Sequence, residues 1–359
     1  MKSKQFRYVY YVDYDTESTV KKIKKLLGLE LAKTEWAKLD QHTSGIVELL
    51  IDKFNRENIK FINYKDANPS IQPDVVLHFD LSKEYKEILT DKWSKSKHIL
   101  CLQECEVIKP YNWNLTAHGL FDKVLTWNTE LISLKKYSHI YSIQGFNGDK
   151  DMPIKLGMSH KKNLVSLVCS NKVSAHPKEL YSERLKCIKW FEKFHQEEFD
   201  LYGYGWNSLP SGANFIIKII KNIPPISRRL AKKYKVYKGF IENKRETLEQ
   251  YKFYISFENA HSVPGYITEK IFDSFISGTI PVYLGAPNVS VFIPEDCYVD
   301  MSKFDSYDEL YDFMLNISEE EYLAYQIRIK NFLESSKGQK YTYDYYACIV
   351  HDNILQLID

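Results

Sequence analysis

The stretch FENAHSVPGYITEKIFDSFISGTIPVYLGAP, residues 257–287, decides how the second half of the chain folds. It begins at the end of an apolar run of β-forming residues, 253–259, which predicts a strand. After a Pro-Gly turn, Thr268 is a good N-cap for a helix with one apolar face, and Gly278 is placed to end that helix. A second apolar run, 279–285, predicts another strand. Strand, helix and strand in this order indicate a parallel βαβ unit.

The start of the predicted helix has the features of an anion site. It follows the carboxyl end of a strand, where ligands bind in open α/β sheets, and its free N–H groups attract negative charge. Lys270 in the first turn is unfavourable for the helix unless an anion is bound there. Glu258 and Glu269 could accept hydrogen bonds from sugar or ribose hydroxyls. A diphosphate joined to a sugar therefore fits, and a solvated network of the three charged side chains is the alternative.

Apolar extended runs alternate with helical patterns in both halves of the chain, which predicts an α/β fold with parallel sheets. The strands expected in the first half are 6–14, 60–65, 73–80, 97–104 and 121–128, with a helix at 44–57 capped by Ser44. In the second half, strands at 163–170 and 199–206 flank a helix at 179–194. A segment rich in glycine, proline and charge, 145–162, predicts a linker. We expect an N-terminal domain at 1–155, a C-terminal domain at 156–340 and a helical tail at 341–359.

Length and composition exclude several classes of protein. The 359 residues are too many for one ordinary core and favour two domains. No window has the ~18 apolar residues that span a bilayer, so we expect a soluble protein, bound at most to a membrane surface. The six cysteines are scattered without zinc-site spacing, which favours free thiols in the cytoplasm. The net charge of +2 and the absence of stacking motifs argue against a nucleic-acid partner.

Three segments around the quoted stretch resemble the signature of glycosyltransferase family 10, the α-1,3/1,4-fucosyltransferases. They are YKFYISFEN (251–259), GYITEK (265–270) and GTIPVYLGAPN (278–288). The resemblance implies the GT-B arrangement, in which two Rossmann-like domains face each other across a cleft. It also implies an inverting enzyme that moves L-fucose from GDP-β-L-fucose to a glycan hydroxyl, with the donor held by the C-terminal domain.

Weaker similarities to the family extend to CSNKVSAHPKELYSERLK (169–186), DLYGYGWN (200–207) and YKGFIENKRETLEQYKF (237–253). On these matches Arg184 and Lys270 contact the donor diphosphate, since the planar fork of arginine suits two phosphate oxygens. The alternative for Arg184 is an arginine on the surface of a helix. The implied donor-binding set is Ser170, Asn171, Arg184, Tyr204, Lys238, Glu258, Asn259, Tyr266, Thr268, Glu269 and Lys270. In this set Glu269 binds fucose or ribose hydroxyls, and Tyr266 stacks on or hydrogen-bonds the nucleotide.

The N-terminal half resembles the family more loosely. HILCLQECEVIKPYNWN (98–114), followed by FDKVLTWN (121–128), is similar to the segment that carries the family's proposed general base at a strand end. Glu104 follows the apolar strand directly and has the longer spacing to Pro110, whereas Glu106 has the shorter one. We expect Glu104 to be the base and keep Glu106 as the alternative.

The resemblance also implies a mechanism. One carboxylate removes a proton from the acceptor hydroxyl, which typically contributes about 10²–10⁴-fold to the rate, while cations stabilise the departing GDP. No metal or other cofactor is required on this account, and stimulation by Mn²⁺ or Mg²⁺ stays open. The Asp-x-Asp triplets DYD (13–15) and DKD (149–151) lie far from the donor motif in sequence, and we interpret both as incidental.

A basic stretch between Leu201 and Ile241 contains no acidic residue and mixes lysines and arginines with isoleucines. This composition is typical of segments on anionic membrane surfaces, so 214–238 is a candidate for peripheral contact with the inner face of the cell membrane. A solvated basic loop beside the donor site is the alternative.

The sequence leaves the acceptor open. Acceptors of the GlcNAc or Glc type, α-1,3 or α-1,4 linkages, and lipopolysaccharide or related glycans all agree with the resemblance. One alternative function is transfer of another GDP-sugar by the same fold. Another is a non-catalytic module that binds a sugar nucleotide or a glycan. A missing carboxylate at the position of the base would favour this function, but Glu104 and Glu106 are both present.

Overall fold

A computed structural model of the chain describes residues 7–12, 41–142, 154–212 and 223–358, together with residues 148, 217 and 220. The chain divides into two compact units: unit 1 comprises Met1–Ile143 and Lys340–Asp359, and unit 2 comprises Gln144–Gln339. The sequence placed the boundary after residue 155 and treated 341–359 as a separate tail, whereas in the structure this C-terminal segment belongs to unit 1. The DYD and DKD triplets lie outside the described residues.

In the described part of unit 1, a six-stranded parallel sheet has the strand order β2-β1-β3-β4-β5-β6. The central strand β3 is buried along its whole length, as expected for a parallel sheet covered on both faces. The strands are β1 (Arg7–Val12), β2 (Ile59–Asn63), β3 (Val75–Phe79), β4 (Lys97–Cys101), β5 (Lys123–Thr126) and β6 (Tyr137–His139).

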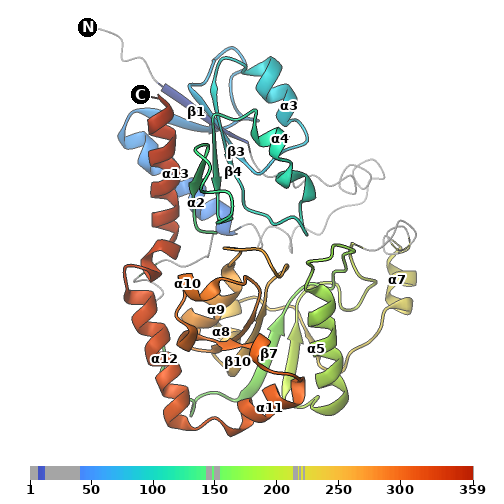
Figure 1. Ribbon diagram of the computed structural model, residues 1–359. Coiled ribbons are helices and arrows are strands. Elements are labelled where there is room, and N and C mark those ends of the chain that lie inside the picture. Colours follow the sequence, from blue (N-terminus) through green and yellow to red (C-terminus); the bar gives the residue numbers. More distant parts are fainter. Residues whose placement is uncertain are drawn as a thin grey trace. The chain divides into compact units, whose positions relative to one another are not determined.

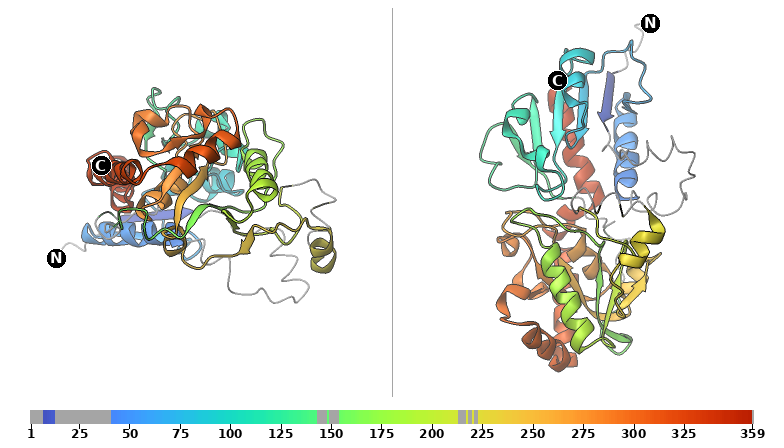
Figure 2. Two further views of the ribbon diagram at one scale, coloured as in Figure 1. Left: turned by 90° about the horizontal axis from the view of Figure 1, so that it is seen from below. Right: turned by 90° about the vertical axis from the view of Figure 1, so that its right-hand side faces the viewer.

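The helices of unit 1 cover this sheet on both faces. The two long helices, α2 (Gln41–Arg56) and α13 (Tyr343–Ile358), pack side by side and share a core with the strands (Figures 1 and 2). The C-terminal helix thus completes the core of the N-terminal half. A second apolar cluster, which includes Leu100 and Val124, lies beneath the short helices. These are α3 (Tyr85–Glu87), the π-helix η1 (Ile88–Lys92), the 3₁₀ helix η2 (Pro110–Trp113) and α4 (Leu115–His118).

Unit 2 contains a second parallel sheet, with the order β12-β11-β10-β7-β8-β9 in its described residues. The chain runs outward from β7 to β9 and then returns to β10, so the switch point lies between β7 and β10, where ligands bind in Rossmann-like sheets. The strands are β7 (Asn163–Val168), β8 (Phe199–Tyr202), β9 (Tyr237–Gly239), β10 (Tyr251–Phe257), β11 (Ile280–Leu284) and β12 (Val299–Asp300).

Helices also cover both faces of this sheet. On one face α5 (Tyr181–Phe194) and α11 (Tyr307–Asn316) contribute to the main core (Figure 1). On the other face α8 (Lys244–Leu248) and α9 (Glu269–Ile276) contact β10, and α12 (Glu319–Glu334) packs on α9. The remaining short elements are α7 (Pro224–Leu230), α10 (Val289–Phe292), η4 (Glu295–Cys297), η5 (Met301–Lys303) and η6 (Gly338–Tyr341). The two parallel sheets confirm the α/β class predicted from the sequence.

Candidate functional site

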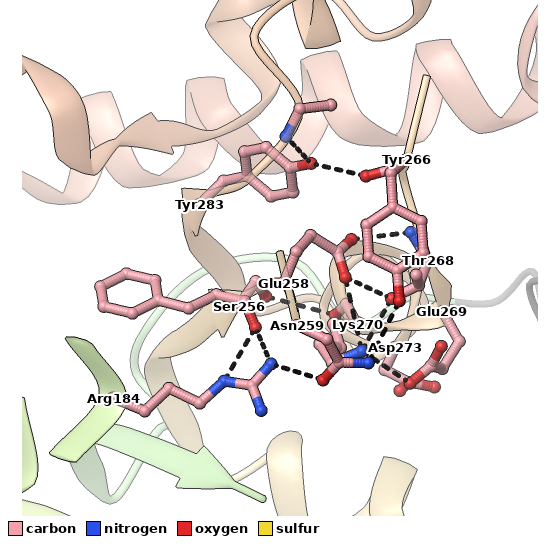
Figure 3. A network of polar contacts seen from close by, with 12 residues as sticks. Arg184, Ser256, Glu258, Asn259, Tyr266, Thr268, Glu269, Lys270, Asp273 and Tyr283 are labelled. Atoms are coloured by element: carbon pink, nitrogen blue, oxygen red, sulfur yellow. Dashed lines mark hydrogen bonds and ion pairs between the residues drawn. The ribbon is translucent and has the colours of Figure 1, made fainter. Parts of the chain in front are cut away.

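The loop after β10 holds the starts of two helices beside the end of that strand. Leu180, which precedes α5, donates its N–H to the carbonyl of Asn259 (3.1 Å), and His261 donates to the carbonyl of Lys178 (2.9 Å). Further along the loop, the N–H of Gly265 is bound by the side chain of Asn288 (2.8 Å). The carboxyl end of β10, the start of α5 and the start of α9 therefore meet in one place (Figure 3).

Glu258 is the first residue after β10 and is fully buried beneath this loop. Its Oε1 accepts the N–H of Thr268 (2.7 Å), and its Oε2 accepts the hydroxyl of Thr268 (2.6 Å) and lies 3.4 Å from Nζ of Lys270. Burial raises the pKa of the Glu258 carboxyl, and the charge of Lys270 opposes that shift. From the sequence we expected this carboxylate to bind sugar hydroxyls. In the structure both of its oxygens contact Thr268 or Lys270 instead.

Thr268 precedes α9 at the expected N-cap position, but its side chain does not cap the helix. The hydroxyl donates to Glu258 instead, and its oxygen accepts a hydrogen bond from Nζ of Lys270 (2.8 Å). The N–H groups in the first turn of α9 are therefore not satisfied by Thr268. At the other end the expectation is confirmed, because Gly278 has a φ of +59° and follows the last turn of the helix.

Lys270 is held as a cation by the carboxylates around it. Its Nζ lies 3.2 Å from Glu269 and 3.4 Å from Glu258, and its side chain is 12% exposed. Burial lowers the pKa of the Lys270 amine, but Glu269 and Glu258 outweigh that effect and raise the pKa above its ordinary value. Lys270 is thus a fixed positive charge at the start of α9.

Arg184 is the second cation, and it is buried rather than on the surface of α5. Its Nε and Nη2 both donate to the carbonyl of Phe257 (3.2 and 2.6 Å), and Nη2 also donates to Oδ1 of Asn259 (3.0 Å). Figure 3 shows its second terminal nitrogen pointing away from these acceptors. Asn259 in turn donates to the hydroxyl of Tyr266 (3.1 Å), whose ring is 1% exposed. Tyr266 therefore packs in the core here, and its ring does not present a stacking surface.

Arg184 also lines a pocket of about 130 Å³, together with Ser170 and Asn171. Asn171 is fixed by its side chain, which donates to the carbonyls of Gly205 (3.1 Å) and Ser208 (3.2 Å). Tyr204 reaches the same region through its backbone carbonyl, which accepts the N–H of Asn171 (2.8 Å). The structure thus places Ser170 and Asn171 in one pocket with Arg184, and the backbone of Tyr204 next to Asn171.

Two lysines depart from the sequence expectation. Lys238 pairs with Asp200 (3.3 Å), and this carboxylate also accepts a hydrogen bond from the hydroxyl of Tyr251. Lys238 is therefore placed with Asp200 rather than with the residues around Lys270. The sequence missed Lys244, whose ammonium pairs with Asp273 on α9 and whose charge acts on Lys270. The only signal for it was its place within the family-like run 237–253, because Asp273 lies too far along the chain to suggest a partner.

The candidate bases lie in unit 1, directly after β4. Glu104 and Glu106 are both half-buried. The N–H of Glu104 donates to Asp80 (3.4 Å), and its carbonyl accepts a hydrogen bond from the indole of Trp113 (3.1 Å). This geometry fixes the backbone at Glu104 and leaves the choice between the two carboxylates open.

The described ranges contain no cluster of three or more His, Cys, Asp or Glu side chains that could hold a metal ion. None of the helices in those ranges has the length and apolar character needed to cross a membrane.

The residues of the site lie in the part of the chain that matches a model of a known protein family. Residues 158–350 match the family model described as glycosyltransferase family 10 (fucosyltransferase), C-terminal part. This range contains both cations and the loop after β10.

Curated relatives match over shorter stretches. An α-(1,3)-fucosyltransferase of Helicobacter pylori is 35% identical over 103 residues, which cover 29% of this chain and 21% of the relative. An α-(1,4)-fucosyltransferase of Arabidopsis thaliana is 38% identical over 73 residues, 20% of this chain and 18% of the relative. Human α-(1,3)-fucosyltransferase 7 is 35% identical over 96 residues, 24% of this chain and 28% of the relative. The chain thus spans less than a third of the length of each of these relatives.

Solved structures match nearly the whole chain at low identity. The crystal structure of an α1,3-fucosyltransferase with GDP-fucose has a TM-score of 0.52 at 17% identity and covers 99% of this chain and 93% of that chain. An Anabaena protein in complex with UDP-glucose has a TM-score of 0.51 at 11% identity, covering 97% and 98%. At these identities the likeness shows the fold alone, which is the GT-B class built from two Rossmann-like domains.

Proposed function

Since the chain belongs to glycosyltransferase family 10, the fucosyltransferase family, we propose that it transfers L-fucose from GDP-β-L-fucose to a hydroxyl of a glycan acceptor with inversion at C1. The observation that carries this proposal is the pair of cations at the carboxyl end of β10, the buried Arg184 and the partly buried Lys270. Both lie within the residues that match the family model. Two fixed positive charges beside the start of a helix suit the diphosphate of a nucleotide sugar.

In this proposal the two cations bind the diphosphate and stabilise the charge that develops on the departing GDP. Arg184 is oriented by the carbonyl of Phe257 and by Asn259 before any donor arrives. Lys270 is oriented in the same way by Glu258 and Glu269. Charged groups that are oriented before the reaction need no reorganisation in the transition state. They therefore stabilise the charge that develops there more effectively than mobile groups do.

The other predicted residues take either direct or supporting roles. Glu269 has a side chain that is 35% exposed, and we assign it to hydroxyls of the fucose or the ribose. Ser170, Asn171 and Tyr204 are assigned to the nucleoside side of Arg184. Four buried or half-buried residues hold the loop rather than face the donor, namely Glu258, Asn259, Tyr266 and Thr268. Lys238 pairs with Asp200 and has a side chain that is 47% exposed, and we keep its assignment to the donor.

The general base is assigned to unit 1. Glu104 is our choice and Glu106 the alternative, since either carboxylate can take the proton from an acceptor hydroxyl. Glu104→Gln is expected to lower kcat by at least 100-fold, within the range that general-base catalysis supplies, while Glu106→Gln keeps most of the activity. The reverse pattern would move the base to Glu106. Loss in neither variant would remove both from the mechanism.

The finer features of the reaction are part of the proposal too. We expect an α-1,3 or α-1,4 linkage to a GlcNAc or Glc type of sugar, in lipopolysaccharide or a related glycan. We expect turnover without an added metal, with room for stimulation by Mn²⁺ or Mg²⁺. Transfer of labelled fucose to a panel of oligosaccharides, with and without EDTA, tests these points.

A peripheral membrane contact is proposed for 214–238, which contains α7. Ile226 and Leu230 on α7 are exposed, and Arg228 and Arg229 lie exposed between them. Aliphatic side chains next to basic ones suit the surface of an anionic bilayer at the inner face of the cell membrane. Flotation with vesicles of phosphatidylglycerol and phosphatidylcholine tests this contact. Absence of co-flotation at low salt would refute it.

The decisive test of the function is calorimetric titration of GDP and GDP-fucose into the wild type and Lys270→Ala. We expect the wild type to bind both and the variant to bind at least tenfold more weakly, about 1.4 kcal/mol. Lys303→Ala is the matched control, because Lys303 pairs with Glu295 on the surface of the same unit. Equal affinity in Lys270→Ala and Lys303→Ala would place the donor elsewhere.

Binding and turnover measurements on the same proteins distinguish this function from two alternatives. Tighter binding and turnover of a different GDP-sugar, such as GDP-mannose, would indicate another donor for the same fold. Binding of GDP-fucose without transfer to any acceptor in the panel would indicate a non-catalytic module.

A further inference from the structure

Asp80 occupies an unusual position in unit 1. It directly follows β3, is fully buried, and has a φ of +60°. Few residues other than glycine adopt this left-handed conformation, and aspartate and asparagine tolerate it best. Burial raises the pKa of the Asp80 carboxyl, and the charge of Lys109 opposes that shift. A buried acid in this backbone conformation indicates a specific demand on its carboxylate.

The carboxylate of Asp80 binds both ends of the segment 103–109. Its Oδ1 accepts the N–H of Gln103 (2.7 Å) and the N–H of Glu104 (3.4 Å), the second and third residues after β4. Its Oδ2 lies 3.6 Å from Nζ of Lys109, whose side chain is 5% exposed. The two glutamates that are candidates for the general base, Glu104 and Glu106, lie between these anchors.

Two tryptophans bind the carbonyl groups of the same two residues. The indole of Trp127 donates to the carbonyl of Gln103 (2.9 Å), and the indole of Trp113 donates to the carbonyl of Glu104 (3.1 Å). The two rings lie against each other with centroids 5.0 Å apart. The N–H and C=O groups of Gln103 and Glu104 are thus all bound by side chains, which fixes the direction in which the segment leaves β4.

We propose that Asp80 is the positioning residue for the general base, and that its buried carboxylate orients the segment 103–109 so that the base meets the acceptor hydroxyl. This inference rests on the proposed function and adds a residue that acts through another. It holds for either choice of base, because the anchors lie on both sides of Glu104 and Glu106.

The charge of Asp80 is the feature to change, because asparagine has the same shape and tolerates the same backbone conformation. In Asp80→Asn, Oδ1 can still accept the N–H of Gln103, but an amide nitrogen in the place of Oδ2 would face the ammonium of Lys109. The anchor at Lys109 is then lost, and thermal unfolding checks that the variant is folded at the assay temperature. A misdirected base lowers the rate of the chemical step, because catalysis needs the reacting groups within a narrow geometry.

Asp122, which precedes β5, offers a control because it binds the start of β4, whereas Asp80 binds the residues that follow the end of β4. It accepts the N–H of His98 (2.7 Å) and pairs with Lys97 (3.0 Å), so it makes the same two kinds of contact as Asp80, but at an exposed position and away from the glutamates. We therefore compare Asp80→Asn with Asp122→Asn in the full-length chain. The measurements are kcat and KM for fucosyl transfer, GDP affinity by calorimetry, thermal unfolding, and amide hydrogen exchange of the peptide 102–109.

We expect Asp80→Asn to lower kcat at least tenfold with GDP affinity within twofold of the wild type, and to speed exchange in 102–109. Asp122→Asn should change neither kcat nor this exchange by more than twofold. An Asp80→Asn enzyme that is folded at the assay temperature and keeps kcat within twofold overturns the proposal. So does unchanged exchange in 102–109, or an equal loss of kcat in Asp122→Asn. A wild type that binds GDP-fucose but never transfers it refutes the proposed function instead, and the positioning role for a base falls with it.

Discussion

Gly285 leaves the space that the buried Glu258 side chain fills, and Gly285→Ala should therefore disturb the whole loop after β10. A Cβ at Gly285 would lie 2.5 Å from Cγ and 2.9 Å from Cβ of Glu258, and 2.6 Å from the hydroxyl of Tyr283. These separations are far below carbon–carbon contact distances, so the neighbours have to move. Neither can do so easily. Glu258 is bound to Thr268 through both oxygens, and the Tyr283 hydroxyl accepts the N–H of Ala286 (3.1 Å).

The expected cost follows from this crowding. Adding a methyl group to a well-packed core costs typically about 1–3 kcal/mol, and the upper end applies here because two fixed side chains are displaced at once. We expect a loss of about 3 kcal/mol in the free energy of unfolding of unit 2. Because Glu258 positions Thr268 and Lys270, we also expect at least tenfold weaker binding of GDP.

Urea unfolding followed by circular dichroism measures the first effect and calorimetry the second. The matched background is Glu258→Ala, which removes Cγ of Glu258, the atom nearest to the new methyl group, while Cβ of residue 258 and the Tyr283 hydroxyl remain. In this background Gly285→Ala should cost at least about 1 kcal/mol less, because contacting residues show coupling energies of that size. An equal cost in both backgrounds, or a loss below about 0.5 kcal/mol in the wild type, would refute the steric argument.

Three further predictions concern stability. Burial lowers the pKa of Lys161 to about 7, so the folded state binds fewer protons than the unfolded state up to about pH 10, and stability rises with pH in that window. The free energy of unfolding of the wild type, relative to that of Lys161→Met, should increase by about 2 kcal/mol between pH 7 and pH 9 in urea unfolding. A difference that does not change with pH would contradict this. Ser306 caps α11 by accepting the N–H of Glu309 (3.2 Å), and Ser306→Ala should lower the unfolding free energy by about 1 kcal/mol. Gly45 lies within α2 with open space at its Cβ position, so Gly45→Ala should raise the thermal midpoint through a gain of about 0.5–1 kcal/mol, and a lowered midpoint would count against it.

The elements that the sequence predicted well are those with strong local patterns. The strands expected at 163–170 and 253–259 correspond to β7 and β10, and the helix expected at 179–194 corresponds to α5. Their apolar residues repeat with one period over a whole element, so the signal does not depend on distant partners. The short strand β9 was missed because its three residues are too few to show a period.

The destination of the C-terminal helix could not be read from its own residues. The apolar face of α13 shows that it must pack on something, but either unit could receive it. In the structure Ala347, Val350 and Ile354 pack in the core of unit 1, against residues of the N-terminal half that are far away in the sequence. Such a long-range contact depends on the shape of the surface that α2 and the sheet leave open, which a local pattern does not encode.

The site shows the same limit at the scale of single hydrogen bonds. Thr268 has the right residue type and position for an N-cap, and its capping was the natural prediction. What changes its role is Glu258, a carboxylate that the end of β10 delivers into a fully buried place. A buried carboxylate needs hydrogen-bond donors far more than an exposed helix end does, because helix N–H groups can turn to water or to a ligand. The hydroxyl therefore goes to the carboxylate.

This exchange has a consequence for the chemistry of the site. With Thr268 turned toward Glu258, its side chain does not cap the first turn of α9, and the start of a helix favours negative charge. Arg184 and Lys270 carry like charges that repel each other, so they can be held together only if internal acceptors offset part of that charge. The carbonyl of Phe257 does so for Arg184, and Glu258 and Glu269 do so for Lys270. The same acceptors that make the cluster stable without a donor also fix the directions of its charges, which is the condition under which a bound diphosphate is stabilised most.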